Sequence, residues 1–366
     1  MPVSIEGSVS IGWLHRRRNF VADESFYFDT DAHHRHFLEN QDFTARTFPE
    51  YEINFFESNL VQTTAWRRDQ VMVGALQPNL ILAAALGAAL RLPGDKDPDV
   101  DGPPLRSAGT DAAARLRGTD LRNAPLVRTF IEQIDAARAR WGNSRPIIPP
   151  FFWDPSGRAT IHGPLTTAQK LVGERLFTDM VDSPDAAGAL LDAVTDAYIE
   201  LCRLFAGRAG MAISEVHVGE CSACMLGPAM FEEFVLPRIQ RLADALGPCR
   251  MHSCGMSDRL LGSFAMIRGL ACVNTGSGTA IRRMREIFGP EFRIEIAPLA
   301  HALSDGGPEA AARFVDQCIE ENGEGPLKIV YHMEPGYPQA NCAALHERLI
   351  DRGAIQRGRR HMAGEA

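Results

Sequence analysis

The sequence has very little lysine and no excess of positive charge. Only three of its 38 basic residues are lysines, and 46 acidic residues outnumber the basic ones, which gives a formal net charge of −8. A protein that binds the nucleic-acid backbone needs a basic face. The charge balance therefore excludes that class of protein.

Long apolar runs are also missing. No stretch approaches the roughly 18 uninterrupted apolar residues of a membrane-spanning helix, and the N-terminus has no apolar segment of the signal-peptide kind. The eight cysteines are scattered along 366 residues, so the fold does not depend on disulfides. We expect a cytoplasmic protein with no membrane and no nucleic-acid partner.

From about residue 70 onward, short apolar runs alternate with amphipathic stretches. The apolar runs, which predict strands, are residues 71–76, 146–152, 212–218, 249–254, 271–275, 292–297 and 327–332. The amphipathic stretches, which predict helices, are residues 167–177, 185–205, 228–246, 257–267, 279–288 and 308–321. This alternation predicts an α/β protein, and the number of units favours a closed (β/α)8 TIM barrel over an open sheet.

The first 65 residues do not share this pattern. They are aromatic and charged with weak periodicity, so we assign residues 1–65 to an N-terminal extension and residues 66–366 to the barrel catalytic domain. The extension is expected to cover the barrel mouth or to build a contact in a homodimer. Its aromatic residues either line a substrate pocket or form a hydrophobic layer: Phe26, Tyr27, Phe28, Phe55 and Phe56.

Reactive side chains follow three of the predicted strands. Function in such barrels sits where strands end, and here the strand ends carry the segments 217–224, 252–255 and 331–336. His252 and Cys254 are two residues apart, so both can face the same side of a strand. Imidazole and thiolate together are typical zinc ligands. The alternative is a buried cysteine beside a hydrogen-bonded core histidine.

Several residues are candidates to complete such a metal site. Glu220 and Cys221 follow one strand and His332 lies at the end of another, and the sequence leaves open which of them binds. Zinc bound to a substrate thiol holds it as a thiolate at neutral pH, whereas zinc-activated water would hydrolyse a substrate. The predicted thiolate ligands favour thiol activation.

Acid–base chemistry without a metal is the competing interpretation. His217, His332 and Glu334 are then the catalytic groups. The protein would be a decarboxylase, lyase or hydrolase acting on a small carboxylated or aromatic substrate.

The segments 163–168, 231–237, 250–255 and 338–341 together resemble the uroporphyrinogen decarboxylase superfamily, and His252-Ser253-Cys254-Gly255 is the most specific of them. The resemblance implies a (β/α)8 barrel. It also implies either haem-pathway decarboxylation or zinc-dependent methyl transfer from corrinoid proteins to thiols.

Two departures favour the methyltransferase branch over the true decarboxylases. The arginine-bearing N-terminal segment of the decarboxylases has no match, and Asn79 stands where that branch has an essential aspartate. One departure is from the methyltransferase branch itself. That branch has a further cysteine near the last strand, whereas this chain has His332 on its last predicted strand. We therefore expect a zinc-dependent methyltransferase for a small-molecule substrate, with any corrinoid carried by a partner protein and Asn79 in the active site.

Overall fold

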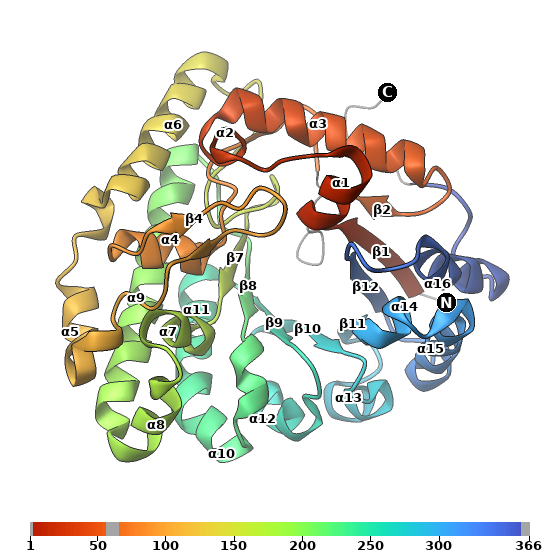
Figure 1. Cartoon of the computed structure of the whole chain (residues 1–366). Helices are drawn as coiled ribbons and strands as arrows, with labels where there is room; N and C mark the ends of the chain where they lie inside the picture. Colours follow the sequence, from red (N-terminus) through yellow and green to blue (C-terminus); the bar gives the residue numbers. More distant parts are fainter. Residues whose placement is uncertain (1–2, 56–65, 360–366) are drawn as a thin grey trace.

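The computed structural model describes residues 3–55 and 66–359. Eight parallel strands form one curled sheet in the order β2 (Ile53–Asn54), β1 (Val3–Val9), β12 (Leu327–Met333), β11 (Arg293–Ala297), β10 (Leu270–Gly276), β9 (Cys249–Ser253), β8 (Glu215–Gly219) and β7 (Arg158–His162). Helices surround this sheet on its outside (Figure 1). The architecture is the predicted (β/α)8 barrel.

Two short strand pairs accompany the sheet. Strands β3 (Val71–Met72) and β6 (Ile147–Ile148) pair in parallel, and β4 (Leu90–Arg91) pairs antiparallel with β5 (Asp99–Val100). A bridge between Phe152 and Ala159 joins the segment after β6 to β7. The β3–β6 pair is thereby tied to the edge of the eight-stranded sheet.

The α-helices follow the strands along the chain. Their bounds are α1 Ile11–Arg18, α2 Glu24–Phe28, α3 Thr30–Thr47, α4 Pro78–Ala85, α5 Ala112–Arg117, α6 Pro125–Trp141, α7 Pro164–Val172, α8 Arg175–Asp182, α9 Pro184–Ala209, α10 Pro228–Met230, α11 Leu236–Leu246, α12 Leu261–Ala265, α13 Ile281–Phe288, α14 Ala300–Ser304, α15 Gly307–Asn322 and α16 Gln339–Asp351. None of the helices in the described ranges is long and apolar enough to cross a membrane.

Each of the seven predicted strands overlaps an observed one, but the prediction missed β1, β2 and β7 of the eight-stranded sheet and the short pair β4 and β5. Strand β1 lies between β2 and β12, and α3 packs against β2 and β3. The segment assigned to an extension thus supplies strands of the sheet and a helix of the outer layer. Glu6 and Ser8 are buried in β1, so the strand lacks the continuous apolar run that the prediction relied on.

Polar residues fill much of the space enclosed by the sheet. Arg250 of β9 contacts Glu295 of β11, although β10 lies between these two strands. Side chains can meet across an intervening strand only on the concave side of a curled sheet. The enclosed space therefore holds polar side chains, and the apolar core lies mainly between the sheet and the helices, as at Tyr198 and Phe205 of α9.

Candidate functional site

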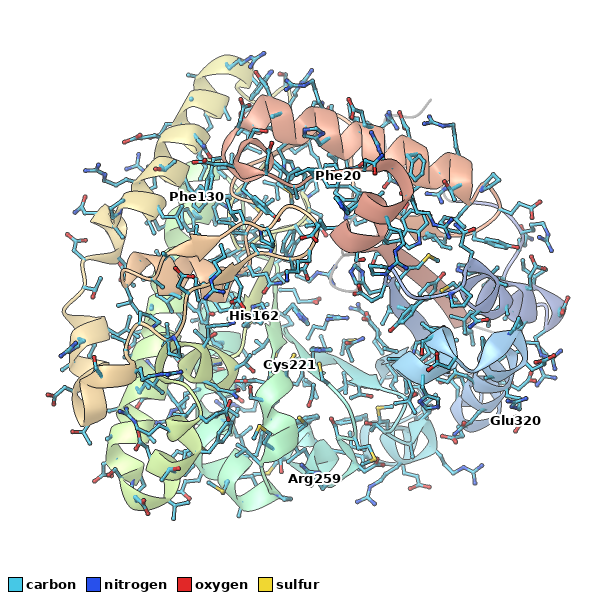
Figure 2. The ribbon with its side chains drawn as sticks, viewed as in Figure 1. Phe20, Phe130, His162, Cys221, Arg259 and Glu320 are labelled. Atoms are coloured by element: carbon cyan, nitrogen blue, oxygen red, sulfur yellow. The ribbon has the colours of Figure 1, made fainter. Side chains whose placement is uncertain are left out.

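Two cysteine sulfurs and one histidine nitrogen, all potential metal ligands, lie close together where β8 and β9 end. Cys221 begins the short 3-10 helix after β8, and His252 and Cys254 lie at the end of β9 and just beyond it. Cys254 Sγ lies 3.2 Å from Cys221 Sγ and 3.2 Å from His252 Nε2, and one ligand atom from each residue falls within 4.8 Å of the other two. Cys221 lies toward the middle of the molecule in Figure 2. We call these three residues the Cys–His–Cys cluster.

The two thiols of the cluster influence each other. Their hydrogen bond lowers the pKa of Cys254 well below its usual range and raises the pKa of Cys221. The cluster therefore favours one thiolate near neutral pH, and a thiolate is the form of cysteine that binds metals.

Asn274 fixes the orientation of His252. The two residues are paired in register on β10 and β9, and His252 Nδ1 forms a hydrogen bond with Asn274 Oδ1. An amide oxygen only accepts, so Nδ1 carries the proton and Nε2 presents its lone pair to Cys254. A histidine that binds a metal commonly donates its other N–H in this way.

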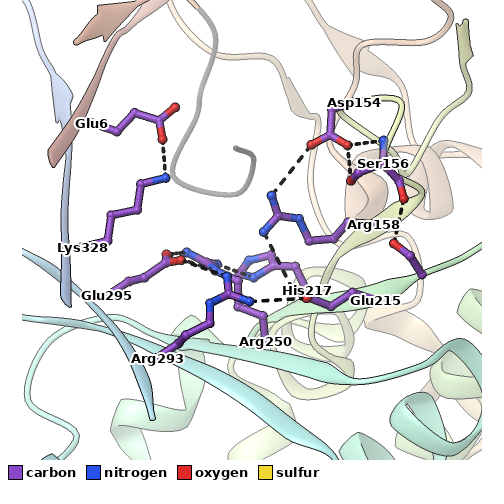
Figure 3. A network of polar contacts seen from close by, with 11 residues as sticks. Glu6, Asp154, Ser156, Arg158, Glu215, His217, Arg250, Arg293, Glu295 and Lys328 are labelled. Carbon is purple, nitrogen blue, oxygen red and sulfur yellow. Dashed lines mark hydrogen bonds and ion pairs between the residues drawn. The ribbon is translucent and has the colours of Figure 1, made fainter. Parts of the chain in front are cut away.

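A network of charged and polar side chains includes Arg250, Glu295 and His217 (Figure 3). Asn274 Nδ2 donates to Glu295 Oε2 at 3.4 Å, and Glu295 accepts from Arg250, whose Nε lies at 3.1 Å. Burial alone would raise the pKa of Glu295, but Arg250 and Lys328 lower it to about 2. The positive charges of Arg250 and Lys328 thus stabilise the ionised carboxylate of Glu295. The network reaches His252 through Asn274, which bonds to both Glu295 and His252.

His217 takes part in this network as a neutral hydrogen-bond acceptor, and its other ring nitrogen carries the proton. Its Nδ1 lies 2.5 Å from an Nη atom of Arg250, which can only donate, so the proton of His217 sits on Nε2. Burial first and Arg250 second hold the pKa of His217 well below its usual value. The ring centroid of His217 lies 6.0 Å from that of His252. With its proton on Nε2 and a low pKa, His217 is suited to donate a hydrogen bond beside the cluster and is poorly suited to act as a general base.

Glu220 is directed away from the Cys–His–Cys cluster. Its fully buried carboxylate accepts the N–H groups of Leu165 at 2.9 Å and Thr166 at 3.0 Å, at the N-terminus of α7. Burial raises the pKa of Glu220 to about 7. The structure thus places this predicted ligand at a helix cap, and it is not one of the three clustered residues.

The remaining predicted site residues lie on other elements. His332 Nδ1 is 2.7 Å from Ser8 Oγ, and its Nε2 is 3.8 Å from Glu334, so these residues form a separate group at the end of β12. Asn79 is buried in the first turn of α4. The structure does not bring His332, Glu334 or Asn79 into the Cys–His–Cys cluster.

The sequence interpretation missed the polar residues that support the site. Asn274, Glu295 and Arg250 lie in segments that were predicted as strands from their apolar residues, and nothing in the sequence assigned these three a role in a site. His162 was also missed. It ends β7, opposite Gly219, which in turn pairs with His252. Its position just before the segment 163–168 was the one available signal.

The fold and the site together define a class of protein: a (β/α)8 barrel with a Cys–His–Cys cluster at the carboxyl ends of two neighbouring strands. Residues 54–345 match the model of the family described as "Uroporphyrinogen decarboxylase (URO-D)", and the chain belongs to this family. The resemblance drawn from the sequence is confirmed.

Two known proteins illustrate the relationship. A uroporphyrinogen decarboxylase from Syntrophotalea carbinolica is 26% identical over 172 residues, which is 45% of this chain and 49% of the relative, so the match spans about half of that relative. A methyltransferase from Methanosarcina mazei superposes with a TM-score of 0.61 at 18% identity, covering 96% of this chain and 94% of the other. This structural likeness shows the fold. The family indicates an enzyme, and these two proteins carry the names of different reactions.

Proposed function

We propose that the protein is a zinc-dependent methyltransferase that moves a methyl group from a methylated donor to a metal-activated acceptor such as a thiol. The observation that carries this proposal is the Cys–His–Cys cluster, whose three ligand atoms lie within 4.8 Å of one another. Two sulfurs and one imidazole nitrogen are a donor set of the kind that zinc prefers.

The residues present fit zinc in three respects. The proton of His252 is held on Nδ1 by Asn274, which leaves Nε2 available as a ligand. The lowered pKa of Cys254 supplies a thiolate. Cys254 is exposed, so a small molecule has access to the site. Three protein ligands leave a fourth position for a substrate, as catalytic zinc sites require.

When bound there, zinc would stabilise the thiolate form of an acceptor by its positive charge. In the transfer, the acceptor sulfur forms the new bond to carbon, and the electron pair of the broken methyl bond stays with the donor. The thiol proton passes to solvent water before this step. We infer that His217, whose ring centroid lies 6.0 Å from that of His252, donates a hydrogen bond from Nε2–H to a polar group of the substrate.

The methyl donor is a methylated small molecule or a methylated corrinoid carried by a partner protein. The likeness in fold to a protein named as a methyltransferase supports methyl transfer in general. The resemblance to the decarboxylases sets Asn79 at the position of their essential aspartate. An amide cannot supply the negative charge that would stabilise a cationic pyrrole, which argues against uroporphyrinogen decarboxylation.

The direct test is a methyl-transfer assay with free methylcobalamin as donor and a panel of small thiols as acceptors. We expect demethylation of methylcobalamin by the zinc-loaded protein, and loss of at least 100-fold in rate for Cys254→Ala, because removing one ligand disrupts the site. Cys224→Ala is the matched control, since Cys224 lies three residues after Cys221 but outside the cluster.

Equal rates in the wild type and in Cys254→Ala would contradict the role of the cluster. Activity that persists without zinc, on a carboxylated substrate, would favour the decarboxylase or lyase alternative instead.

A further inference from the structure

Three of the eight cysteines can be reached by a reagent in solution. Cys254 is exposed, and Cys221 and Cys224 are partly exposed. The oxidation of a cysteine in a folded protein depends on its exposure. Oxidation of the folded chain is therefore confined to the neighbourhood of the Cys–His–Cys cluster, because the other five cysteines are buried: Cys202, Cys249, Cys272, Cys318 and Cys342.

Two of the accessible cysteines already touch each other. The Sγ atoms of Cys221 and Cys254 lie 3.2 Å apart. A disulfide holds its two sulfurs about 2 Å apart, so the bond requires a movement of about 1 Å. Cys254 lies one residue beyond β9 and is followed by Gly255, where the described residues leave open space around a Cβ position. This end of the pair is free to make the movement.

The backbone keeps the two cysteines together. The N–H group of Glu220, the residue before Cys221, donates to the carbonyl oxygen of His252 on β9 at 2.8 Å. On the other side, the N–H group of Ser222 donates to Thr166 Oγ1 at 3.1 Å. The segment that carries Cys221 is thus anchored both to the strand that leads to Cys254 and to α7.

The sequence alone suggests another partner for Cys221. Its spacing to Cys224 is that of a Cys-x-x-Cys motif, in which the two cysteines commonly form a disulfide. The structure instead brings the sulfur of Cys221 to Cys254, and within the described ranges no such sulfur contact joins it to Cys224. Arg259 holds Cys224 by a hydrogen bond to its backbone carbonyl oxygen.

We propose that Cys221 and Cys254 form a redox-active pair, which a peroxide converts reversibly into a disulfide. The exposed Cys254 sulfur attacks one peroxide oxygen, the O–O bond breaks, and one water leaves as Cys254 becomes a sulfenic acid. The Cys221 sulfur then attacks the Cys254 sulfur, the S–O bond breaks, and the hydroxyl group leaves with the thiol proton as a second water. The pair loses two electrons, and the peroxide is reduced to two waters.

The disulfide removes two of the three ligands from the Cys–His–Cys cluster, because metals bind the thiolate form of cysteine. Oxidation would therefore release zinc and stop a reaction that depends on it, and a thiol reductant would restore the site. The release of zinc rests on the proposed function. The disulfide itself does not, since it forms in the metal-free chain as well.

The test treats the reduced, metal-free full chain with hydrogen peroxide and maps its tryptic peptides by mass spectrometry without reduction. We expect a link between the peptide 251–259, which contains Cys254, and the peptide 209–238, which contains Cys221 and Cys224. Two of the eight thiols should be lost, and dithiothreitol should restore both. In zinc-loaded protein, a chromophoric chelator should record the release of about one zinc per chain in step with the loss of thiols.

Matched variants identify the two sulfurs. Cys224→Ser should form the same link as the wild type, whereas Cys221→Ser should form no disulfide. A link within the peptide 209–238 in the wild type, no disulfide in the metal-free chain, or an unchanged link in Cys221→Ser would overturn the proposal, and the first two results need no variant. A wild type that binds no zinc but forms the disulfide would support the redox pair and contradict only the proposed function.

Discussion

Asn274 determines how His252 meets the other two members of the cluster. Its side-chain oxygen holds the Nδ1 proton, and its amide group is held in turn by Glu295. We predict that Asn274→Ala weakens zinc affinity about 10- to 100-fold, the usual range for a partner of a metal-binding histidine. Competition with a chromophoric chelator measures this affinity.

A second buried asparagine serves as the control. Asn341 lies in α16 and donates to the carbonyl oxygen of Leu303 at 2.9 Å, far from the cluster in the sequence. Asn341→Ala should lower the thermal midpoint and leave zinc affinity unchanged. Equal affinity of the wild type and Asn274→Ala would show that Asn274 does not orient the ligand.

Glu220 provides a second prediction at the scale of one residue. Its carboxylate satisfies the amides of Leu165 and Thr166 and the hydroxyl of Thr166. Glu220→Ala leaves these buried groups without an acceptor, and we expect it to destabilise the fold by about 2–3 kcal/mol. Urea denaturation measures the loss. The metal content should not change, and its disappearance in folded Glu220→Ala would show that Glu220 is a ligand after all.

The residues of the site were predictable to different degrees. His252 and Cys254 share a strand end two residues apart, so the sequence alone placed them on one side. Glu220 and Cys221 are neighbours in sequence, yet the turn into a 3-10 helix directs one toward α7 and the other toward the cluster. Sequence spacing carries no information about such a turn. Asn274 could not be found either, since its role arises only from the pairing of β10 with β9.

At the scale of elements, strand β1 depends on a close approach between Gly7 and Tyr331. A Cβ atom on Gly7 would lie 2.5 Å from Cζ of the Tyr331 ring, which is fully buried against it. We predict that Gly7→Ala destabilises the fold by about 1–3 kcal/mol, the usual cost of overpacking. The urea midpoint is the measurement.

Gly336→Ala is the control for this substitution. Nothing lies within 4 Å of a Cβ at Gly336, and its φ is not positive. It should shift the midpoint by no more than about 0.5 kcal/mol, as for an ordinary surface change. Similar effects of the two substitutions would mean that β1 does not pack on β12 as described.

The elements were predicted well where the apolar pattern was continuous. Strands β8 to β12 carry apolar runs because the helices cover one of their faces. Strand β1 escaped prediction because Glu6 and Ser8 face polar partners on β12, namely Lys328 and His332. A strand whose side chains face a polar barrel interior lacks the apolar run from which strands are predicted.

At the scale of the whole molecule, buried histidines make stability depend on pH. Burial lowers the pKa of His33 and His162 to about 4 and that of His346 to about 3. The unfolded chain takes up protons on these residues below about pH 6.5, whereas the folded chain does not. Stability is therefore full above pH 6.5 and falls as the pH decreases, by about 1.4 kcal/mol per pH unit for each histidine.

Urea denaturation at pH 7, 6 and 5 tests this dependence. His346→Gln should show a smaller fall between pH 6 and pH 5 than the wild type, because one proton fewer is taken up on unfolding. The exposed His301 offers the control His301→Gln, which should keep the wild-type dependence. An unchanged dependence in His346→Gln would contradict burial of the neutral ring.

The central claim is that Cys221, His252 and Cys254 form one zinc site. Elemental analysis of the purified wild type, Cys221→Ser, Cys254→Ser and Cys224→Ser tests it most directly. We expect about one zinc per chain in the wild type and in Cys224→Ser, and none in the other two variants. A wild type without zinc that does not bind added zinc, or equal zinc in all four proteins, would contradict it.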